Sequence, residues 1–123
     1  MMDRRLEDGA RGEAIAAAML ERAGMRLVAR NVRYRVGELD IIAEDEETLV
    51  FVEVRSRWRR NGPRAEDTVT FGKQRRLSKA ALLFWRLYRG SCRRARFDVV
   101  AVDLARGQVA AHHRAAFELR EGG

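Results

Sequence analysis

Two acidic residues in neighbouring apolar segments, Asp40 and Glu53, are the strongest candidates for chemistry in this sequence. Residues 38–44 and 48–55 are rich in β-branched and apolar residues, which is typical of strands, and an acidic turn separates them. If a two-residue turn at 46–47 joins the strands, Asp40 lies opposite Glu53. Directly opposed residues on paired strands have Cβ atoms about 4.5–5.5 Å apart. The sequence therefore predicts two adjacent carboxylates on one face of a hairpin.

Adjacent carboxylates repel each other, so this pair needs a shared proton, a basic side chain or a divalent metal ion. Oxygen ligands suit Mg²⁺ or Mn²⁺, which bind one or two carboxylates together with water and phosphate oxygens. The alternative is that Arg55, on the same face two residues after Glu53, neutralises the pair as a structural salt bridge. The residues alone leave the metal site and the salt bridge open.

The segments around these carboxylates resemble a known family. Residues 31–42, NVRYRVGELDII, and residues 49–57, LVFVEVRSR, are similar to the YraN-like family of small bacterial proteins. That family is similar in turn to the restriction-endonuclease-like nuclease superfamily, which includes archaeal Holliday-junction resolvases. The resemblance implies an α/β fold with a restriction-endonuclease-like αβββαβ core, a mixed sheet flanked by helices. The likeness extends to Gly12-Glu13, Lys73 and residues 96–100.

The superfamily signature is an Asp on the second core strand and a Glu-x-Lys on the third, often with a Glu on the first helix. Asp40 and Glu53 match the strand carboxylates, and Glu13 matches the helix acid. The resemblance implies that Asp40, Glu53 and the Val54 carbonyl hold Mg²⁺ or Mn²⁺ beside a scissile phosphate. Glu13 then supports a bound water or a second ion, and water is the nucleophile in phosphodiester hydrolysis.

Arg55 stands where the signature has lysine, and this departure leaves more than one function open. An arginine is permanently protonated and cannot act as a base, although it stabilises phosphate charge. With Arg55 in that catalytic role, the chain is a metal-dependent nuclease, acting for example on branched or structured DNA. The alternatives are a non-catalytic nucleic-acid-binding module, in which Arg55 seals a degenerate site, and an adaptor that uses the fold for protein contacts.

Basic residues after the third strand are candidates for nucleic-acid binding. The loop 56–64 carries several arginines around Trp58, whose indole could stack on a base. A cation in the first turn of a helix opposes the helix dipole, but the free N–H groups there favour phosphate. A solvated loop and a surface lysine are the alternatives. The candidate contacts are Arg57, Trp58, Arg59, Arg60 and Lys73.

Hydrophobic periodicity predicts the elements that must position these groups. Gly24 and Gly90 follow two helical patterns, and Thr70 is a candidate N-cap for the second. The predicted order is α-β-β-β-α-β-β, two helices packed on a mixed sheet. The helices are predicted at residues 9–23 and 71–89, and the strands at 25–36, 38–44, 48–55, 96–103 and 108–113.

Three residues that could suggest a further site are interpreted as structural. His112 and His113 are adjacent on the last predicted strand and point to opposite faces, which makes them poor joint metal ligands. Asp98, in the strand before, is expected to form a salt bridge.

Chain length and net charge limit the number of domains and the kinds of partner. The 123 residues are predicted to form one domain, 1–123, and the net charge of +7 favours a polyanionic partner such as nucleic acid or an anionic membrane surface. The nuclease resemblance implies nucleic acid, DNA more than RNA. No apolar signal segment is visible, no apolar run is long enough for a membrane span, and Cys92 is the only cysteine. We therefore expect a cytoplasmic protein with no membrane association. The sequence is compatible with a monomer or a homodimer.

Overall fold

A computed structural model describes residues 3–59 and 61–118, and within these ranges every predicted helix and strand is present. A short 3₁₀ helix that periodicity did not predict, η1, lies between the third strand and the second helix. The elements are α1 (Arg4–Arg22), β1 (Arg26–Tyr34), β2 (Gly37–Asp45), β3 (Thr48–Arg57), η1 (Ala65–Thr68), α2 (Phe71–Leu87), β4 (Arg94–Asp103) and β5 (Gln108–Phe117).

The helices begin where side chains can accept from free backbone N–H groups. Asp3 caps α1 by accepting from the Arg5 amide at 2.8 Å, so this helix begins five residues earlier than its apolar pattern predicts. Thr70 caps α2 as predicted, since its hydroxyl accepts from the Lys73 amide at 3.2 Å. The caps fix the direction in which the first turn of each helix meets the sheet.

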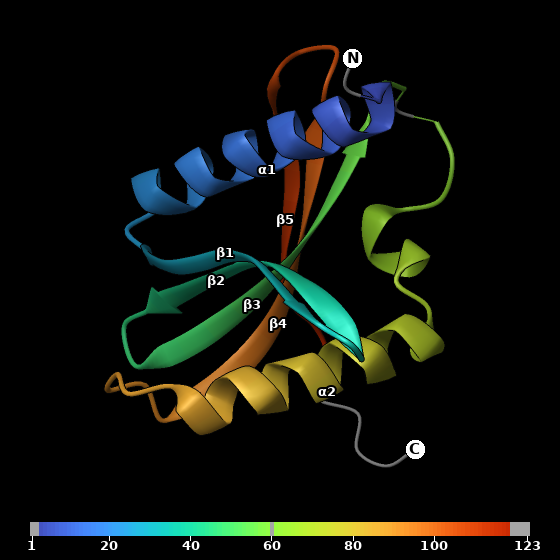
Figure 1. Ribbon diagram of the computed structural model, residues 1–123. Coiled ribbons are helices and arrows are strands. Elements are labelled where there is room, and N and C mark those ends of the chain that lie inside the picture. The colour runs from blue at the N-terminus through green and yellow to red at the C-terminus, as the bar shows by residue number, and fades with distance from the viewer. Residues whose placement is uncertain (1–2, 60, 119–123) are drawn as a thin grey trace.

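The five strands form one mixed sheet in the order β1-β2-β3-β4-β5 (Figure 1). β3 and β4 are parallel and are joined by the crossover through α2, while the other neighbouring strands are antiparallel. Figure 1 shows α1 on one side of the sheet and α2 on the other. This arrangement confirms the predicted α/β class and is consistent with a restriction-endonuclease-like core.

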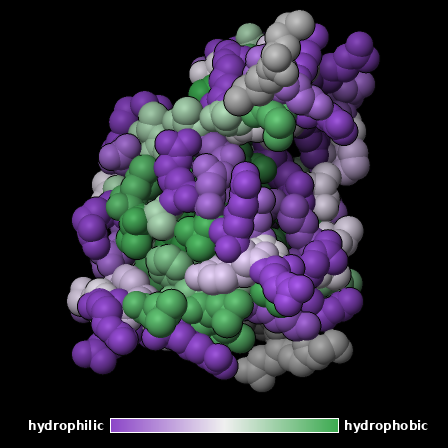
Figure 2. All heavy atoms as spheres, in the orientation of Figure 1, coloured by the Kyte–Doolittle hydropathy of each residue, from purple (hydrophilic) through white to green (hydrophobic). Residues whose placement is uncertain are grey.

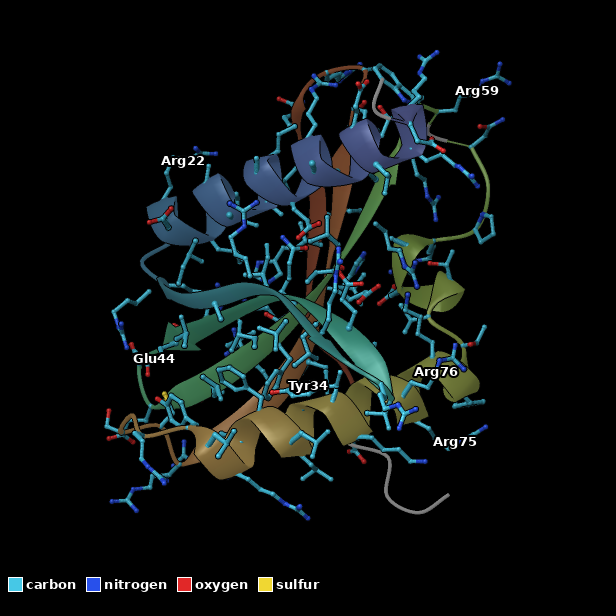
Figure 3. All side chains as sticks on the ribbon, viewed as in Figure 1. Arg22, Tyr34, Glu44, Arg59, Arg75 and Arg76 are labelled. Carbon is cyan, nitrogen blue, oxygen red and sulfur yellow. The ribbon has the colours of Figure 1, made fainter. Side chains whose placement is uncertain are left out.

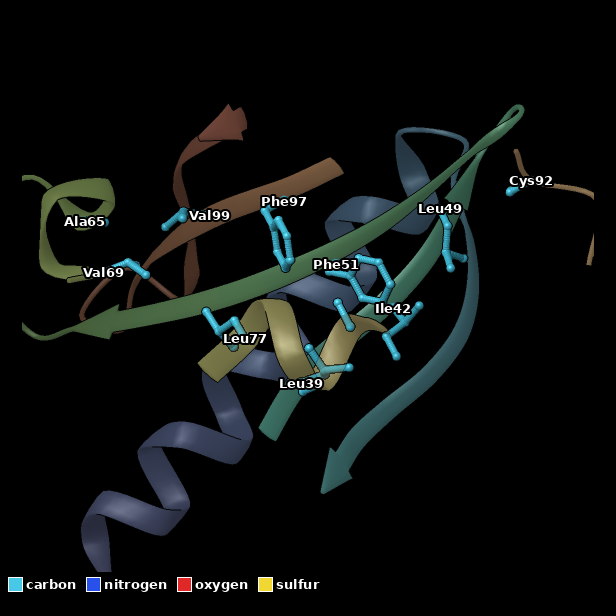
Figure 4. Packing of buried hydrophobic residues seen from close by; sticks show 12 residues of the cluster. Leu39, Ile42, Leu49, Phe51, Ala65, Val69, Leu77, Cys92, Phe97 and Val99 are labelled. Atoms are coloured by element: carbon cyan, nitrogen blue, oxygen red, sulfur yellow. The ribbon is translucent and has the colours of Figure 1, made fainter. Parts of the chain in front are cut away.

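Each helix covers its own hydrophobic cluster because alternate strand residues point to opposite faces of the sheet. Between α1 and the sheet, Leu20 of the helix packs with Ile41 and Val52 of the strands. Between α2 and the sheet, Leu77 of the helix packs in the same cluster as Phe51, and Figure 4 shows this cluster continuing to Ala65, Val69 and Val99 beside η1. The two clusters hold the sheet between the helices.

The sheet opens into a fork between β2 and β3. Their pairing follows the predicted register from Asp45↔Thr48 to Ile41↔Val52 and does not continue beyond it, although both strands do. β2 instead stays paired with β1 as far as Tyr34↔Gly37. The tip of this β1–β2 hairpin approaches α2 so closely that a Cβ at Gly37 would lie 3.0 Å from the Arg76 carbonyl oxygen. The hairpin therefore follows α2 while β3 follows β4.

Asp98 fastens the far edge of the sheet and has the structural role that the sequence predicts. Its side chain is fully buried and accepts from Arg96, from the Ala115 amide at 3.0 Å and from the ring of His112 at 2.8 Å. Because His112 and Ala115 belong to β5, these bonds hold that strand against β4 beyond its predicted end at residue 113. His113 instead contacts Glu66 of η1 at 3.4 Å.

Candidate functional site

Asp40 and Glu53 lie immediately beyond the last paired residues of the fork. Asp40 Oδ2 accepts a hydrogen bond of 2.9 Å from the Val54 amide, so a side chain takes the place of a strand carbonyl where the ladder ends. Glu53 is buried, with 6% of its surface exposed. Both carboxylates line the same opening, together with Glu13, Val54 and Arg55. The structure thus brings together the acidic residues that the sequence singled out.

Two of these acids are unusually hard to ionise. Burial and the neighbouring charge of Glu53 raise the pKa of Asp40 to about 7, against the lowering effect of the Val54 hydrogen bond. Burial and the charge of Asp40 likewise raise the pKa of Glu13 to about 7. Asp40 and Glu13 are therefore partly protonated near neutral pH. A bound cation would favour their ionised forms by supplying positive charge.

Asn31 is a site residue that the sequence reasoning missed. With its amide oriented so that the nitrogen faces Glu13, Asn31 Nδ2 lies 2.8 and 3.2 Å from the two carboxylate oxygens. Its backbone has φ +52, a left-handed conformation that asparagine tolerates better than most residues. Left-handed backbone in the middle of β1 turns the side chain toward α1, and an asparagine within a strand pattern was the available signal.

Lys73 lies beside the carboxylate pair, and its contact with phosphate stays a prediction. Its ammonium Nζ lies 3.1 Å from Glu53 Oε1. The second pocket beside the fork is lined by Asp40, Glu53 and Lys73 together with residues of the hairpin tip. Lys73 therefore brings an amine to the carboxylate pair from α2, whereas the superfamily signature brings it from the third strand.

Arg55 approaches the same carboxylate less closely. Its Nη2 is 3.7 Å from Glu53 Oε1, at the long end of ion-pair distances. The Arg55 Nε–H is buried, and nothing in the described ranges accepts a hydrogen bond from it. A buried donor without an acceptor is rare in folded proteins. A quarter of the Arg55 side chain is exposed at the opening, and that part of it can meet an anion there.

The donors at the fork fit a hard divalent cation that retains water. No group of three or more acidic, histidine or cysteine side chains within residues 3–59 and 61–118 is close enough to form a ready-made metal cage. Mg²⁺ commonly uses one or two carboxylates and completes its shell with water and phosphate oxygens. Asp40 and Glu53 meet that requirement, while Glu13 is held by Asn31 and needs to move to contribute.

The basic segment after β3 is only partly an open binding surface. Trp58 donates its indole N–H to Asp8 at 2.7 Å, and the guanidiniums of Arg4 and Arg11 lie 5.6 and 5.7 Å from its ring centroid. The ring thus links the end of β3 to α1, while 45% of Trp58 is exposed, and its stacking on a base stays a prediction. Arg57 and Arg59 line a separate cavity described below. Arg60 lies outside the described residues.

The surface around the fork is hydrophilic. Figure 2 shows hydrophilic side chains over most of the visible face, with hydrophobic ones gathered over β1 and parts of α2. Arg75 and Arg76 lie on α2 near the hairpin tip, and Arg59 lies at the opposite end of the molecule (Figure 3). Neither helix in the described ranges combines the length and hydrophobicity needed to cross a bilayer.

Comparisons with known proteins give the family. The profile described as "Uncharacterised protein family UPF0102" matches residues 12–102, which include both fork carboxylates. A UPF0102 protein of Syntrophus aciditrophicus is 47% identical over 103 residues, covering 84% of this chain and 81% of the relative. One of Nocardia farcinica is 44% identical over 111 residues (89% and 87%), and one of Geobacter metallireducens is 42% identical over 113 residues (90% and 92%). The expected YraN-like membership is confirmed, and the chain belongs to family UPF0102.

Proposed function

We propose that this protein is a metal-dependent phosphodiesterase that cleaves nucleic acid, DNA rather than RNA, at the fork between β2 and β3. The observation that carries the proposal is the composition of the fork. Asp40, whose raised pKa reflects burial and the neighbouring charge of Glu53, lies with Glu53 beside a lysine ammonium and a partly exposed arginine. Phosphoryl chemistry requires carboxylates that bind a cation and, next to them, hydrogen-bond donors that bind the phosphate.

Asp40, Glu53 and the Val54 carbonyl would hold Mg²⁺ or Mn²⁺ at the fork. When bound, such an ion polarises the phosphoryl oxygen and lowers the pKa of water. Val54 is suited to this role because its amide already ties it to Asp40, which sets the position of the peptide next to both carboxylates.

The remaining side chains act on the phosphate and on protons. The guanidinium of Arg55, a quarter of whose side chain is exposed at the opening, donates to a phosphate oxygen. Lys73 balances the charge of Glu53 and, with its ammonium at the rim of the opening, donates to a second phosphate oxygen. Glu13, with a pKa of about 7, is able to take a proton from the attacking water at neutral pH.

The second candidate is a nucleic-acid-binding module without cleavage. The salt bridges from Lys73 and Arg55 to Glu53 favour it, because two cations on one carboxylate can close a site as well as serve it. In that case the fork is a structural ion cluster, and basic residues elsewhere bind the nucleic acid.

The test compares cleavage and binding in the same variants. Asp40→Asn and Glu53→Gln keep the shape of the fork and should abolish Mg²⁺- or Mn²⁺-dependent cutting of branched, flapped or single-stranded DNA. Affinity for the uncut DNA should change little, since these residues hold the cation. Arg55→Lys should cut at least as well as the natural protein, because it supplies the signature amine. Glu21→Gln, an exposed carboxylate at the far end of α1, is the control.

Absence of cutting in the natural protein and in Arg55→Lys, with both metals and all substrates, contradicts the proposal. If tight binding persists in that case, the module without cleavage is the better description. Cutting that survives Asp40→Asn contradicts the assignment of the fork as the reaction centre.

A further inference from the structure

A further cavity, separate from the opening and the pocket at the fork, lies on the sheet face that α2 covers only in part. Its volume is about 490 Å³, within the range of about 300–1,000 Å³ that small-molecule sites occupy. It is bounded by the C-terminal ends of β3 and β4, the start of β5 and the first residue of η1. Neither the fork carboxylates nor Lys73 line it.

The cavity joins an apolar floor to a basic rim. The floor is formed by small residues of the face that α2 covers, Ala65, Ala101 and Ala111. Three arginines, Arg57, Arg59 and Arg64, stand around it. Arg64 is held by Glu66 at 2.5 Å. The acidic residue that lines the cavity, Asp103, accepts a hydrogen bond of 3.1 Å from the Arg106 amide. The rim of the cavity therefore carries more positive than negative side chains, and its floor is apolar.

A β-bulge shapes the floor. β4 pairs Ala101 with Ala111 and then Val102 with Val109, so Ala110 is an extra residue on β5. Extra residues of this kind bend a strand locally and are over-represented beside functional sites. His113, which lines the cavity from the same strand, is held by Glu66 of η1 at 3.4 Å. The bulge and the contact with η1 thus fix both walls.

The cavity is in line with the fork. Arg57 follows Arg55 by two residues on β3, so both side chains leave the same face about 6.6 Å apart along the strand. Arg55 in turn pairs with Ala101 of the cavity floor. A strand whose phosphate lies at Arg55 therefore has its neighbouring nucleotide beside this cavity.

We propose that the cavity takes one unpaired nucleotide of the nucleic-acid strand, which rests on the proposed function of the fork. The base lies on the apolar floor, where guanidinium planes and the His113 ring are available for stacking. Its phosphate meets Arg57 and Arg59, whose forked donors match phosphate oxygens. A base in this position has left its duplex stack, and that step costs least when the nucleotide is already single-stranded. The preferred substrates are consequently single strands and the unpaired arms of flapped or branched DNA.

The experiment measures affinities with the full-length protein in EDTA, so that cleavage plays no part. The probes are a short fluorescent single strand and the duplex of the same sequence, followed by anisotropy. Ala111→Phe fills the cavity without changing charge, and Arg57→Ala with Arg59→Ala removes the rim. The controls are Ala14→Phe on the exposed side of α1 and Arg22→Ala at the end of α1 remote from Arg59 (Figure 3).

Ala111→Phe should weaken single-strand binding about tenfold, the reduction expected when one base can no longer stack, with less than about a twofold change for duplex. The double arginine variant should lower single-strand affinity more than Arg22→Ala does. Circular dichroism establishes that each variant is folded, and if Ala111→Phe is not, Ala111→Leu replaces it.

Equal reductions for single strand and duplex, or no reduction on filling the cavity, overturn the proposal. Failure of the natural protein to bind any single strand also overturns it, even if cleavage by the fork is observed. The converse result, selective weakening in Ala111→Phe without any cleavage, supports the nucleotide cavity and contradicts the phosphodiesterase.

Discussion

The positive charge at Glu53 comes from two side chains of different chemistry, and the closer one is not on the strand. Lys73 Nζ is 3.1 Å from the carboxylate and Arg55 Nη2 is 3.7 Å away. An ammonium can exchange a proton with water, whereas a guanidinium cannot. The fork therefore keeps an amine although its strand position holds arginine, and the absence of the signature lysine is not by itself a reason to expect an inactive site.

The two lysines of the chain allow a matched comparison, since both lie on α2. Lys73→Ala should lower kcat on single-stranded or flapped DNA by about a hundredfold, the effect of removing one charged donor from a reaction centre. Lys79→Ala removes an equal charge from an exposed position and should leave kcat within about twofold. Steady-state kinetics in Mn²⁺ distinguish the two. Equal effects of both variants would show that Lys73 contributes only general charge.

The raised pKa of Asp40 makes the metal-free protein less stable at high pH. The native carboxyl keeps its proton up to about pH 7, whereas the unfolded chain releases it near 3.8. Because the native state binds more protons in this window, the free energy of unfolding falls as pH rises from about 4 to 7. Asp40→Asn removes that destabilisation and should stabilise the metal-free protein at pH 8 by about 1–3 kcal/mol in urea denaturation.

Glu21→Gln should change that free energy by less than about 0.5 kcal/mol. Mg²⁺ should raise the Tm of the natural protein more at pH 8 than at pH 6, since the ligands must be deprotonated, and should leave Asp40→Asn unchanged. A less stable Asp40→Asn at pH 8 would contradict the raised pKa of Asp40.

The sequence predicts which residues are neighbours within a hairpin better than it predicts contacts between a helix and the sheet. A period of two residues and a turn of two predict the observed register as far as Ile41↔Val52, and Asp40 and Glu53 lie just beyond it, where the strands part. The contact of Lys73 with Glu53 depends on where α2 crosses the sheet, and no spacing in the chain encodes that distance. Asn31 was missed because its left-handed backbone departs from the strand pattern in which it lies.

Among the elements, α1 is placed against the sheet by one close approach. A Cβ at Gly12 would lie 1.8 Å from Ser56 Oγ and 3.0 Å from Ser56 Cβ, so glycine is needed for α1 to reach β3. Glu13 follows Gly12 directly, and the approach therefore also sets the depth at which the helix carboxylate enters the site. The cap at Asp3 adds the first turn, which carries Asp8 to Trp58.

Gly12→Ala should lower the free energy of unfolding by about 1–3 kcal/mol, because the methyl group displaces Ser56. Gly9→Ala on the same helix has open space around its Cβ and should stabilise by about 0.5–1 kcal/mol through helix propensity. The double variant Gly12→Ala with Ser56→Gly should recover most of the stability. Urea denaturation of the four proteins gives the coupling, and additive effects would contradict the close approach.

Element boundaries were less predictable than element types. Each predicted helix and strand exists, because periodicity reports which face is buried. β5 extends four residues past its predicted end since Asp98 of β4 accepts from its backbone, a tertiary contact that local pattern does not contain. η1 was not predicted because a four-residue helix has too few turns to show a period.

On the scale of the whole molecule, the net charge of +7 is arranged so that basic side chains lie at both ends of the fork. Composition predicts a polyanionic partner but not where it binds. The structure supplies candidates, with Arg57 at the end of β3, Arg59 just beyond it, and Arg75 and Arg76 beside the hairpin tip. A strand laid across the fork passes both groups.

Binding to DNA should fall steeply with salt, since each neutralised phosphate releases counterions. Replacing Arg57 and Arg59 by alanine should reduce the slope of log affinity against log salt, by about 0.7 on single strands for each phosphate that the variant no longer neutralises. Arg22→Ala should leave the slope unchanged. If the slope is unchanged in the double variant, Arg57 and Arg59 do not contact phosphates, and the binding surface lies instead on the α2 side.

The hydrogen bond from the Val54 amide to Asp40 also makes the fork observable by amide hydrogen exchange. Most strand amides are protected by a neighbouring backbone carbonyl, but this one is protected by a side chain that changes charge near neutral pH. Its deuterium uptake therefore follows the ionisation of Asp40 and any cation that competes for the same oxygen. One peptide group thus reports occupancy of the fork without substrate, product or label.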